Sequence, residues 1–386
     1  MIRVALSDFR WPLDPALAST RDETTLARAL YSTPLRTDAS ERVVAGLCTA
    51  WSASDDFRAW SFRCRDALEI AAELRRVGRM RASPANWIFS AAQRVTVPSP
   101  GRLLVRLRIA WRRFPYALTA VAAAPRGVPG PFRLVSGSRT RVVARGNGVT
   151  LVFLRLAPLA AEHAFLRGRV DEAPVPLGDA GRFGASSQIV HVRPLLALDA
   201  VVFRGSSVPP DVRRAYWQTA DRSDYQALVA ENGASTALDV TGANERADPA
   251  AFRRTLHSIP SLPPLPVRIA VPRDPTLRYG ARILYAQWRE LGLGPQLVAP
   301  HARADGDFTR ARAVYPQQEA LLGALQLQTA LGNDDQHSAF AEVDARVRTD
   351  ATIMPVCWVA DARLVSPRLD GWREDVLGDV DYTALR

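Results

Sequence analysis

Alternation of apolar and polar residues predicts strands in several parts of the chain. The clearest stretch spans residues 102–109, in which the apolar members are Leu103, Val105, Leu107 and Ile109 and the polar members include Arg102, Arg106 and Arg108. One face of such a strand is buried and the other is wet, so we expect this arginine stripe to be a solvated face and not a ligand site. A further strand is predicted at 2–6, and hairpins are predicted at 93–111 and 128–145.

Helical spacing of apolar residues predicts helices at 22–31, with Thr20 as a possible N-cap, and at 67–79. Two more helices are expected between 210 and 232, the first capped by Asp211 and the second by Ser223. A short helix and a proline-rich connector are expected within 247–265.

The strongest α/β signal lies between residues 267 and 299. A strand at 267–271, an amphipathic helix at 276–291 and a second strand at 296–299 follow one another, and such a unit closes right-handedly into a parallel sheet. Residues 353–364 predict an apolar strand pair, so the end of the chain is expected to be structural and not a tail.

Two of the three cysteines fall in a predicted hairpin at 43–65 that turns at 54–57. Cys48 and Cys64 are equidistant from this turn, so they would face each other across the strands. A bridge between them would require an oxidising compartment. The alternative, which we favour from the sequence, is a pair of small buried thiols.

Length and composition restrict the class of protein. The 386 residues suggest two or three lobes, and the content of 47% apolar and 23% charged residues argues against a disordered chain. No run of 18 or more apolar residues occurs, which excludes an apolar membrane-spanning helix.

The formal net charge of +11 would ordinarily suggest a nucleic-acid partner. All fifty basic residues are arginine, however, and they are scattered in runs no longer than pairs, which is typical of a GC-rich codon bias. We therefore do not expect nucleic-acid binding as the main role. A dispersed positive surface would equally help to hold the protein near an anionic membrane.

Motifs for catalysis or metal binding are missing from the sequence. The five histidines lack HxxxH and HExxH spacing, no CxxC, Walker A or GxSxG motif occurs, and the paired carboxylates fall in predicted turns. We therefore expect no cofactor, no metal and no enzymatic activity. What remains is a set of aromatic residues in predicted loops that are candidate ligand platforms, namely Trp11, Trp87, Phe203, Tyr315, Trp358 and Trp372.

The order of several short motifs resembles the family 5 extracytoplasmic solute-binding proteins of ABC importers, the oligopeptide, dipeptide and nickel-binding class. Residues 13–15 (LDP) resemble the opening segment of that family, and residues 44–66 are similar to its "PGLAESW…SDDG…YTFHLRDG" stretch. Residues 127–135 (GVPGPFRLV) are similar to "GTGPYRLV". Residues 211–222 resemble "DVRRAL…AIDR", and 355–372 resemble the closing "PVYYY…ARLV…VKGW".

The chain also departs from this family. It is distinctly shorter than is common there, and a helix begins directly after residue 66, where the family has a further stretch. In the family's peptide binders an aspartate holds the α-amine of the ligand, and the best-matching position here is Val314. A valine cannot pair an ammonium group, so we expect a neutral or anionic ligand in place of an ordinary free peptide. No signal sequence precedes the strand at 2–6, and we expect a mature form without its leader.

The resemblance implies an α/β, periplasmic-binding-protein-like fold (type II, cluster C-like), with two α/β lobes plus a smaller third lobe around a hinged ligand cleft. Lobe I would comprise 1–35, 128–206 and 349–386, small lobe II 36–127 and lobe III 207–348. Seven residues are expected to line the cleft and bind ligand: Thr20, Arg21, Trp87, Phe203, Arg204, Tyr315 and Trp358.

The implied function is capture of a peptide-like or other small solute and its delivery to an ABC permease in the membrane. The protein would act as a monomer in the periplasm or outside the cell, anchored to the membrane in its full-length form. One alternative is a transport-incompetent sensor or interaction scaffold on the same fold, which a small or blocked cleft would favour. The second alternative is an enzyme or a nucleic-acid binder. An enzyme would need a convergent catalytic cluster, and a nucleic-acid binder would need one continuous arginine face.

Overall fold

The computed structural model describes residues 1–120, 130–176, 179–183, 188–205, 207–229, 234–241, 266–300, 302–328, 331 and 335–385. The expected helix and connector at 247–265 lie outside these residues. None of the helices in the described ranges combines the length and apolar character that crossing a bilayer demands.

Eleven strands of the described chain form one mixed sheet in the order β15-β14-β16-β12-β17-β11-β1-β10-β9-β8, with β13 paired to β17 off this path. The strands are β1 (Ile2–Leu6), β8 (Arg133–Gly137), β9 (Arg141–Gly146), β10 (Val149–Arg155), β11 (Glu172–Pro174), β12 (Val190–Phe203), β13 (Ser235–Thr236), β14 (Pro266–Ala270), β15 (Gly294–Val298), β16 (Gly306–Arg312) and β17 (Ile353–Val365). β14 and β15 pair in parallel, which confirms the predicted β-α-β unit.

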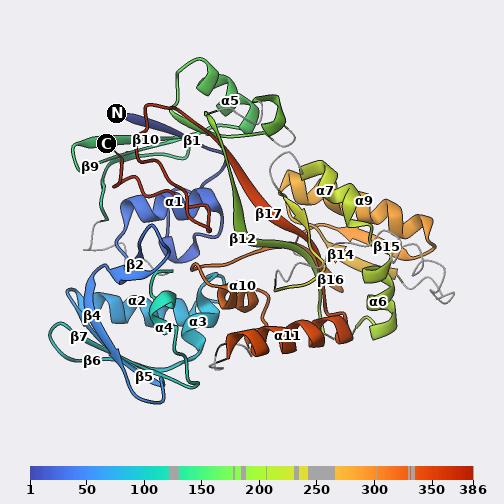
Figure 1. Cartoon of the computed structure of the whole chain (residues 1–386), viewed down its shortest axis with the longest axis horizontal. Helices are drawn as coiled ribbons and strands as arrows, with labels where there is room; N and C mark the ends of the chain where they lie inside the picture. The colour runs from blue at the N-terminus through green and yellow to red at the C-terminus, as the bar shows by residue number, and fades with distance from the viewer. Residues whose placement is uncertain are drawn as a thin grey trace.

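Strands β12 and β17 form the long antiparallel pair that runs between the two ends of this sheet (Figure 1). The prediction of a strand pair at 353–364 is wrong, because one continuous strand of 13 residues spans this region. The ladder is interrupted between Pro194 and Leu198. There the amide of Leu196 donates to the carbonyl of Val376 at 2.8 Å. The carbonyl of Leu196 accepts from the amide of Ala313 at 2.9 Å. The break therefore ties β12 to two other segments.

A smaller sheet has the order β4-β5-β7-β6. Its strands are β4 (Cys48–Ala53), β5 (Ala59–Cys64), β6 (Ala92–Ser99) and β7 (Arg102–Leu107), and β2 (Leu35–Thr37) pairs with β3 (Val43–Ala45) beside it. Helices α2 (Ala67–Arg79) and α3 (Asn86–Ser90) lie between this sheet and the rest of the molecule (Figure 1). Leu103, Val105 and Leu107 of β7 are buried and its two arginines are exposed, which confirms the expected solvated face.

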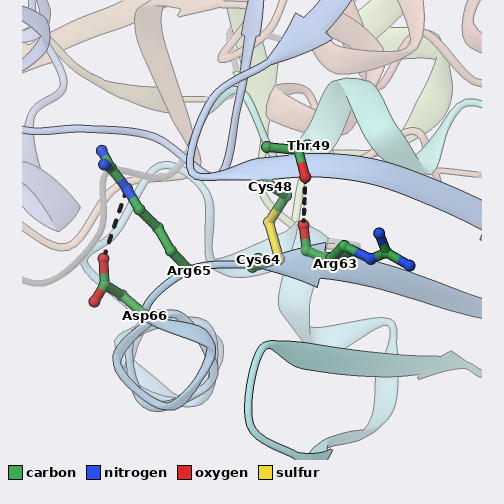
Figure 2. Close-up of a disulfide and its surroundings, with 6 residues drawn as sticks. All are labelled: Cys48, Thr49, Arg63, Cys64, Arg65 and Asp66. Atoms are coloured by element: carbon green, nitrogen blue, oxygen red, sulfur yellow. Dashed lines mark hydrogen bonds and ion pairs between the residues drawn. A yellow bond between two sulfur atoms is a disulfide. The ribbon is translucent and has the colours of Figure 1, made fainter.

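Cys48 and Cys64 form a disulfide (Figure 2). The expectation of two free thiols is therefore wrong. The physical reason is the register of the hairpin, which pairs the two residues directly across β4 and β5 and so brings their β-carbons together. Cys357 is a free, buried cysteine.

The remaining helices are η1 (Pro15–Leu17), α1 (Arg21–Leu30), α4 (Phe114–Ala117), α5 (Pro158–Leu166), η2 (Ala180–Phe183), α6 (Pro210–Gln218), α7 (Arg222–Val229), α9 (Pro275–Glu290), α10 (Gln318–Ala324) and α11 (Gln336–Asp350). Thr20 accepts the amide of Glu23 and is the N-cap of α1, as predicted. The caps assigned to Asp211 and Ser223 are wrong. Helix α6 starts one residue before Asp211, and the carboxylate of Asp221 accepts the Ser223 amide at the start of α7.

The largest hydrophobic core extends from the small sheet into the helices that follow β16. It includes Phe62 and Leu103 of the small sheet, Tyr315, Leu321 of α10 and Val343 of α11. Apolar side chains from residues far apart in the sequence thus share one continuous interior. A core of this kind resists separation of its two sides, because separation would expose apolar surface to water.

Candidate ligand site between the lobes

A small cavity lies where three segments of the chain meet: the loop before α1, residues 83–85 before α3, and residues 312–314 at the end of β16. Its volume is about 70 Å³. Small apolar side chains make up much of the wall, namely Ala16, Ala18, Ala27, Ala85, Ala120 and Ala313. A space of this size holds roughly five water molecules, so the inner cavity by itself is too small for a peptide.

The charged groups of the inner cavity neutralise one another. Arg28 contacts Asp379 at 2.9 Å and Asp375 at 3.0 Å, and Arg312 contacts Asp379 at 3.3 Å. Burial lowers the pKa of Arg28, but the two carboxylates outweigh burial and raise it. Among the described lining residues Asp379 is the one carboxylate, and it is already shared by two arginines. Val314 lines the same wall and offers no charge.

An outer cavity of about 650 Å³ adjoins the inner one and shares Arg28, Thr33, Thr119 and Asp379 with it. It lies between the segment that contains β2 and β3 and the C-terminal segment 371–384. This volume is in the range of small-molecule sites.

Arginines and carboxylates both line the outer cavity. Arg193 pairs with Glu41 at 2.8 Å, whereas Arg36 and Arg373 form no ion pair with another residue of the described chain. Asp381 also lines this cavity and forms no ion pair with another described residue. Two unneutralised guanidinium groups thus stand against one such carboxylate, and this excess of positive charge can attract an anion.

Two of the seven expected ligand residues come together. The ring centroids of Trp87 and Tyr315 are 6.1 Å apart, and Trp111 joins them at 5.9 Å from Trp87 and 6.5 Å from Tyr315. Trp87 and Tyr315 follow the lining residues Ala85 and Val314 in sequence, but their own rings pack against each other beside the cavity.

Sequence reasoning missed Trp111 of this aromatic cluster and the Glu319 carboxylate that Trp111 contacts. The indole of Trp111 donates to the Glu319 carboxylate at 3.5 Å, and Arg113 lies 3.6 Å from the same carboxylate. Burial raises the pKa of Glu319, and Arg113 only partly offsets this. No local motif marks Trp111 or Glu319, because the contact joins residues 208 positions apart.

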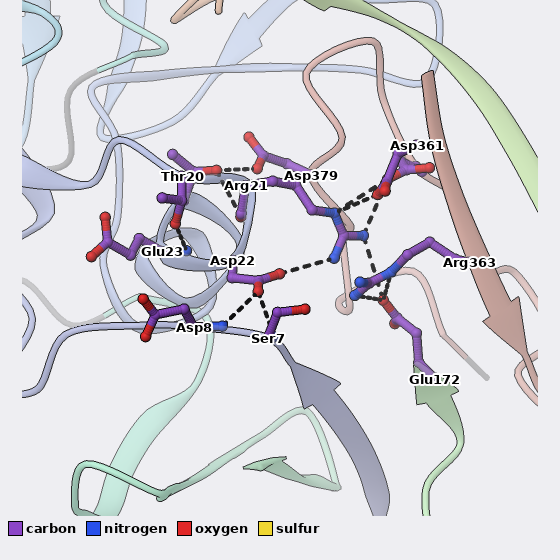
Figure 3. A network of polar contacts seen from close by, with 12 residues as sticks. Ser7, Asp8, Thr20, Arg21, Asp22, Glu23, Glu172, Asp361, Arg363 and Asp379 are labelled. Atoms are coloured by element: carbon purple, nitrogen blue, oxygen red, sulfur yellow. Dashed lines mark hydrogen bonds and ion pairs between the residues drawn. The ribbon is translucent and has the colours of Figure 1, made fainter. Parts of the chain in front are cut away.

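Arg21 belongs to a buried charge network, and Thr20 next to it is exposed at the cap of α1 (Figure 3). The guanidinium of Arg21 lies 3.0 Å from Asp361, 3.1 Å from Glu374 and 3.5 Å from Glu172. Its side chain is only 12% exposed. The charge of Arg21 is thus used within the protein.

Other members of this network have shifted pKa values. Burial would raise the pKa of Glu172, but Arg363 and Arg21 outweigh it and hold the pKa below its ordinary value. Burial, helped by the neighbouring charge of Asp361, raises the pKa of Glu374 to about 8. This raised pKa favours the protonated form of Glu374 at neutral pH.

The other three expected residues lie along the central strands. Phe203 is buried against Tyr216, with ring centroids 6.3 Å apart, and Arg204 pairs with Asp307 at the surface. Trp358 is half-buried in the middle of β17. In the β12–β16 ladder, Arg312 of the inner cavity pairs with Ala197. Phe203 lies six residues further along β12, so it is about 20 Å from the inner cavity.

Within the described ranges, no group of three or more histidine, cysteine, aspartate and glutamate side chains is arranged to hold a metal ion. Asp375 and Asp379, which line the outer cavity, are instead engaged by arginines. What the site offers is an enclosed space, two unneutralised arginines and an apolar inner wall, which is an arrangement suited to binding.

The structure superposes on known solute-binding proteins over nearly its whole length. For the Escherichia coli murein tripeptide-binding protein MppA the TM-score is 0.79 at 17% sequence identity, covering 98% of this chain and 96% of that chain. For the dipeptide-binding protein of Pseudoalteromonas sp. SM9913 in complex with Met-Leu it is 0.79 at 13% identity, covering 100% and 99%. For NikZ of Campylobacter jejuni in complex with Ni(L-His) it is 0.73 at 15% identity, covering 96% and 94%. The sequence matches no protein-family model and none of the curated proteins.

The chain thus has the type II periplasmic-binding-protein fold, and the predicted fold class is confirmed. These neighbours are binding proteins for peptides or metal chelates. At sequence identities this low the likeness establishes the fold, and the ligand has to be argued from the site itself.

Proposed function

We propose that the protein is an extracytoplasmic solute-binding protein that encloses a small solute between its lobes and presents the closed form to an ABC permease. The observation that carries this proposal is the link between the inner cavity and the break in the β12–β17 ladder. Leu196, at the break, bonds to Ala313 of the cavity wall and to Val376 beside the lining residue Leu377. A ligand that contacts this wall would bias the strand pair about which the lobes close, and no bond would be made or broken.

The ligand of this site would be neutral or anionic. Arg36 and Arg373 face the outer cavity without a carboxylate partner in the described chain. The inner wall has Val314 and a neutralised Asp379, so a ligand ammonium group would be buried there without a counter-charge. We therefore propose a small carboxylate or other anion and not a free cationic peptide.

One observation favours a second candidate function, a sensor or interaction scaffold that does not transport. The hydrophobic core continues without a break from the small sheet to α10 and α11, and the inner cavity is small. A protein whose lobes share a core opens less readily than one whose lobes meet across a wet cleft. The two candidates differ in whether the protein opens and holds a ligand.

Native mass spectrometry of the purified protein tests the proposal. We expect an adduct of small defined mass that is released on denaturation. The variant Val314→Asp should lose the adduct, because it adds a carboxylate to the inner wall. The same change at the exposed Val135 of β8 is the matched control and should retain the adduct.

Circular dichroism would first establish that both variants are folded. Tight binding of a free cationic peptide to the wild-type protein would overturn the proposed ligand class. The transport role would be overturned in favour of the scaffold by two results together. The wild-type protein would carry no adduct, and its X-ray scattering profile would show no separation of the lobes.

A further inference from the structure

The outward face of the small sheet is strongly basic. Exposed arginines occupy outward positions on β5, β6 and β7, and two more flank these strands: Arg58, Arg63, Arg94, Arg102, Arg106 and Arg108. None of the four strands contains an aspartate or glutamate, and among the described residues that line the hollow on this face Asp56, in the turn before Arg58, is the one carboxylate. The opposite face packs on α2 and α3, so the arginine face points away from the rest of the molecule (Figure 1).

The strand register places like charges directly opposite one another. Arg63 pairs across the strands with Arg102, and Arg94 pairs with Arg106. Like charges at directly opposite positions destabilise a sheet. None of the four forms an ion pair with another described residue, and Arg102 has only a hydrogen bond of 3.3 Å to the Ser61 hydroxyl.

These arginines differ from the less exposed arginines of the large sheet and α1. Arg21, Arg28 and Arg363 each contact at least one carboxylate there. A sheet that places unneutralised arginines opposite one another is less stable than one with neutral residues at those positions. An anionic partner that binds across the face would remove this repulsion.

We propose that this face binds an anionic phospholipid surface. Clusters of four to eight arginines or lysines near a bilayer bind acidic lipids, and the planar guanidinium group suits phosphate oxygens. The outward residues between the arginines are mostly small, including Ala50, Ser52, Ala59, Ser61 and Thr96, so lipid headgroups can reach the guanidinium groups. The outward positions hold no aromatic side chain, which single-stranded nucleic-acid sites use to stack bases.

Co-sedimentation with vesicles tests this assignment with the full chain. We expect binding to phosphatidylcholine vesicles that contain phosphatidylglycerol, loss of binding at high salt, and no binding to pure phosphatidylcholine. The triple variant Arg63→Gln, Arg102→Gln and Arg106→Gln should bind the anionic vesicles more weakly by a factor on the order of a hundred.

A control variant removes the same charge elsewhere. Arg273, just before α9, and Arg278 and Arg282, in the first half of α9, are exposed and form no ion pair with another described residue. Changing all three to glutamine should alter binding less than about twofold. The face variant should also unfold at the same or a higher temperature than wild type, because it loses like-charge pairs.

Three outcomes would overturn the proposal. Equal losses in the face and control variants would show that only net charge matters, and equal binding to both kinds of vesicle would show that phosphate headgroups are not recognised. Tighter binding to a duplex oligonucleotide than to vesicles, lost in the face variant alone, would assign the face to nucleic acid.

Discussion

Gly323 of α10 provides a test of how firmly the small sheet is held against the rest of the protein. A β-carbon at this position would lie 2.4 Å from Cζ2 and 2.5 Å from Cη2 of Trp87. Both distances are shorter than carbon atoms tolerate, so Gly323→Ala must displace the indole. The indole is held in turn by stacking on Trp111, with ring centroids 5.9 Å apart.

The expected change in the free energy of unfolding for Gly323→Ala follows from two opposing effects. Overpacking of a core costs about 1–3 kcal/mol. Replacing glycine by alanine in a helix returns up to about 1 kcal/mol through propensity. Gly323→Ala should therefore destabilise the wild-type protein by about 0–2 kcal/mol. It should stabilise a Trp87→Leu background by up to about 1 kcal/mol, since the ring atoms that it meets are then gone.

A double-mutant cycle measures this difference directly. Urea unfolding followed by circular dichroism on the four proteins should give a coupling energy of about 1–3 kcal/mol between Trp87 and Gly323. Independent sites add to within about 0.3–0.5 kcal/mol. A coupling energy inside that margin would refute the reasoning, because it would mean that Trp87 is not seated on α10 in solution and that the two sides of the core are apart.

Three further predictions concern stability. Glu374 has an ordinary pKa of 4.5 and a pKa of about 8 in the folded protein, so the folded state binds a proton that the unfolded chain releases. The free energy of unfolding should fall by up to about 5 kcal/mol as the pH rises from 4.5 to about 8. Glu374→Gln should flatten the pH dependence of the urea midpoint. An unchanged slope would exclude Glu374 as its source. Arg21→Ala removes one of the cations that neutralise Asp361 and its buried neighbours and should cost about 3–5 kcal/mol in urea unfolding. A loss below about 1 kcal/mol would contradict a buried network. Replacing Cys48 and Cys64 by serine should cost about 2–4 kcal/mol. Identical melting of the wild-type protein with and without a thiol reductant would contradict the bridge.

For the candidate site, individual residues could be selected from the sequence, but their contacts with residues far away in the sequence could not be predicted. Trp87 and Tyr315 could be selected as aromatic residues outside the regular patterns, but their contact with Trp111 depends on how the small sheet docks on the segment after β16. Arg21 could be selected as a cation near an expected cleft. Its neutralisation by Asp361 joins residues 340 positions apart, and no local pattern reports such a contact.

The arginine face shows the same division within one sheet. Alternation within 102–108 correctly predicted one solvated strand face. That Arg63 and Arg94 continue this face could not be predicted, because strand order and register decide which side chains are neighbours. A shift of one residue would turn every outward side chain inward.

Local periodicity by itself determined the strand at 2–6, the helices near the N-terminus and the parallel β-α-β unit, because burial of one face imposes a repeat that neighbouring residues share. The order of short motifs then pointed to the binding-protein fold. Only the tertiary structure decided the disulfide, the break at Leu196, the neutralised charges around Asp379 and the two cavities. These depend on which distant segments meet, and that choice is made by the packing of whole elements against one another and not by the residues of any one element.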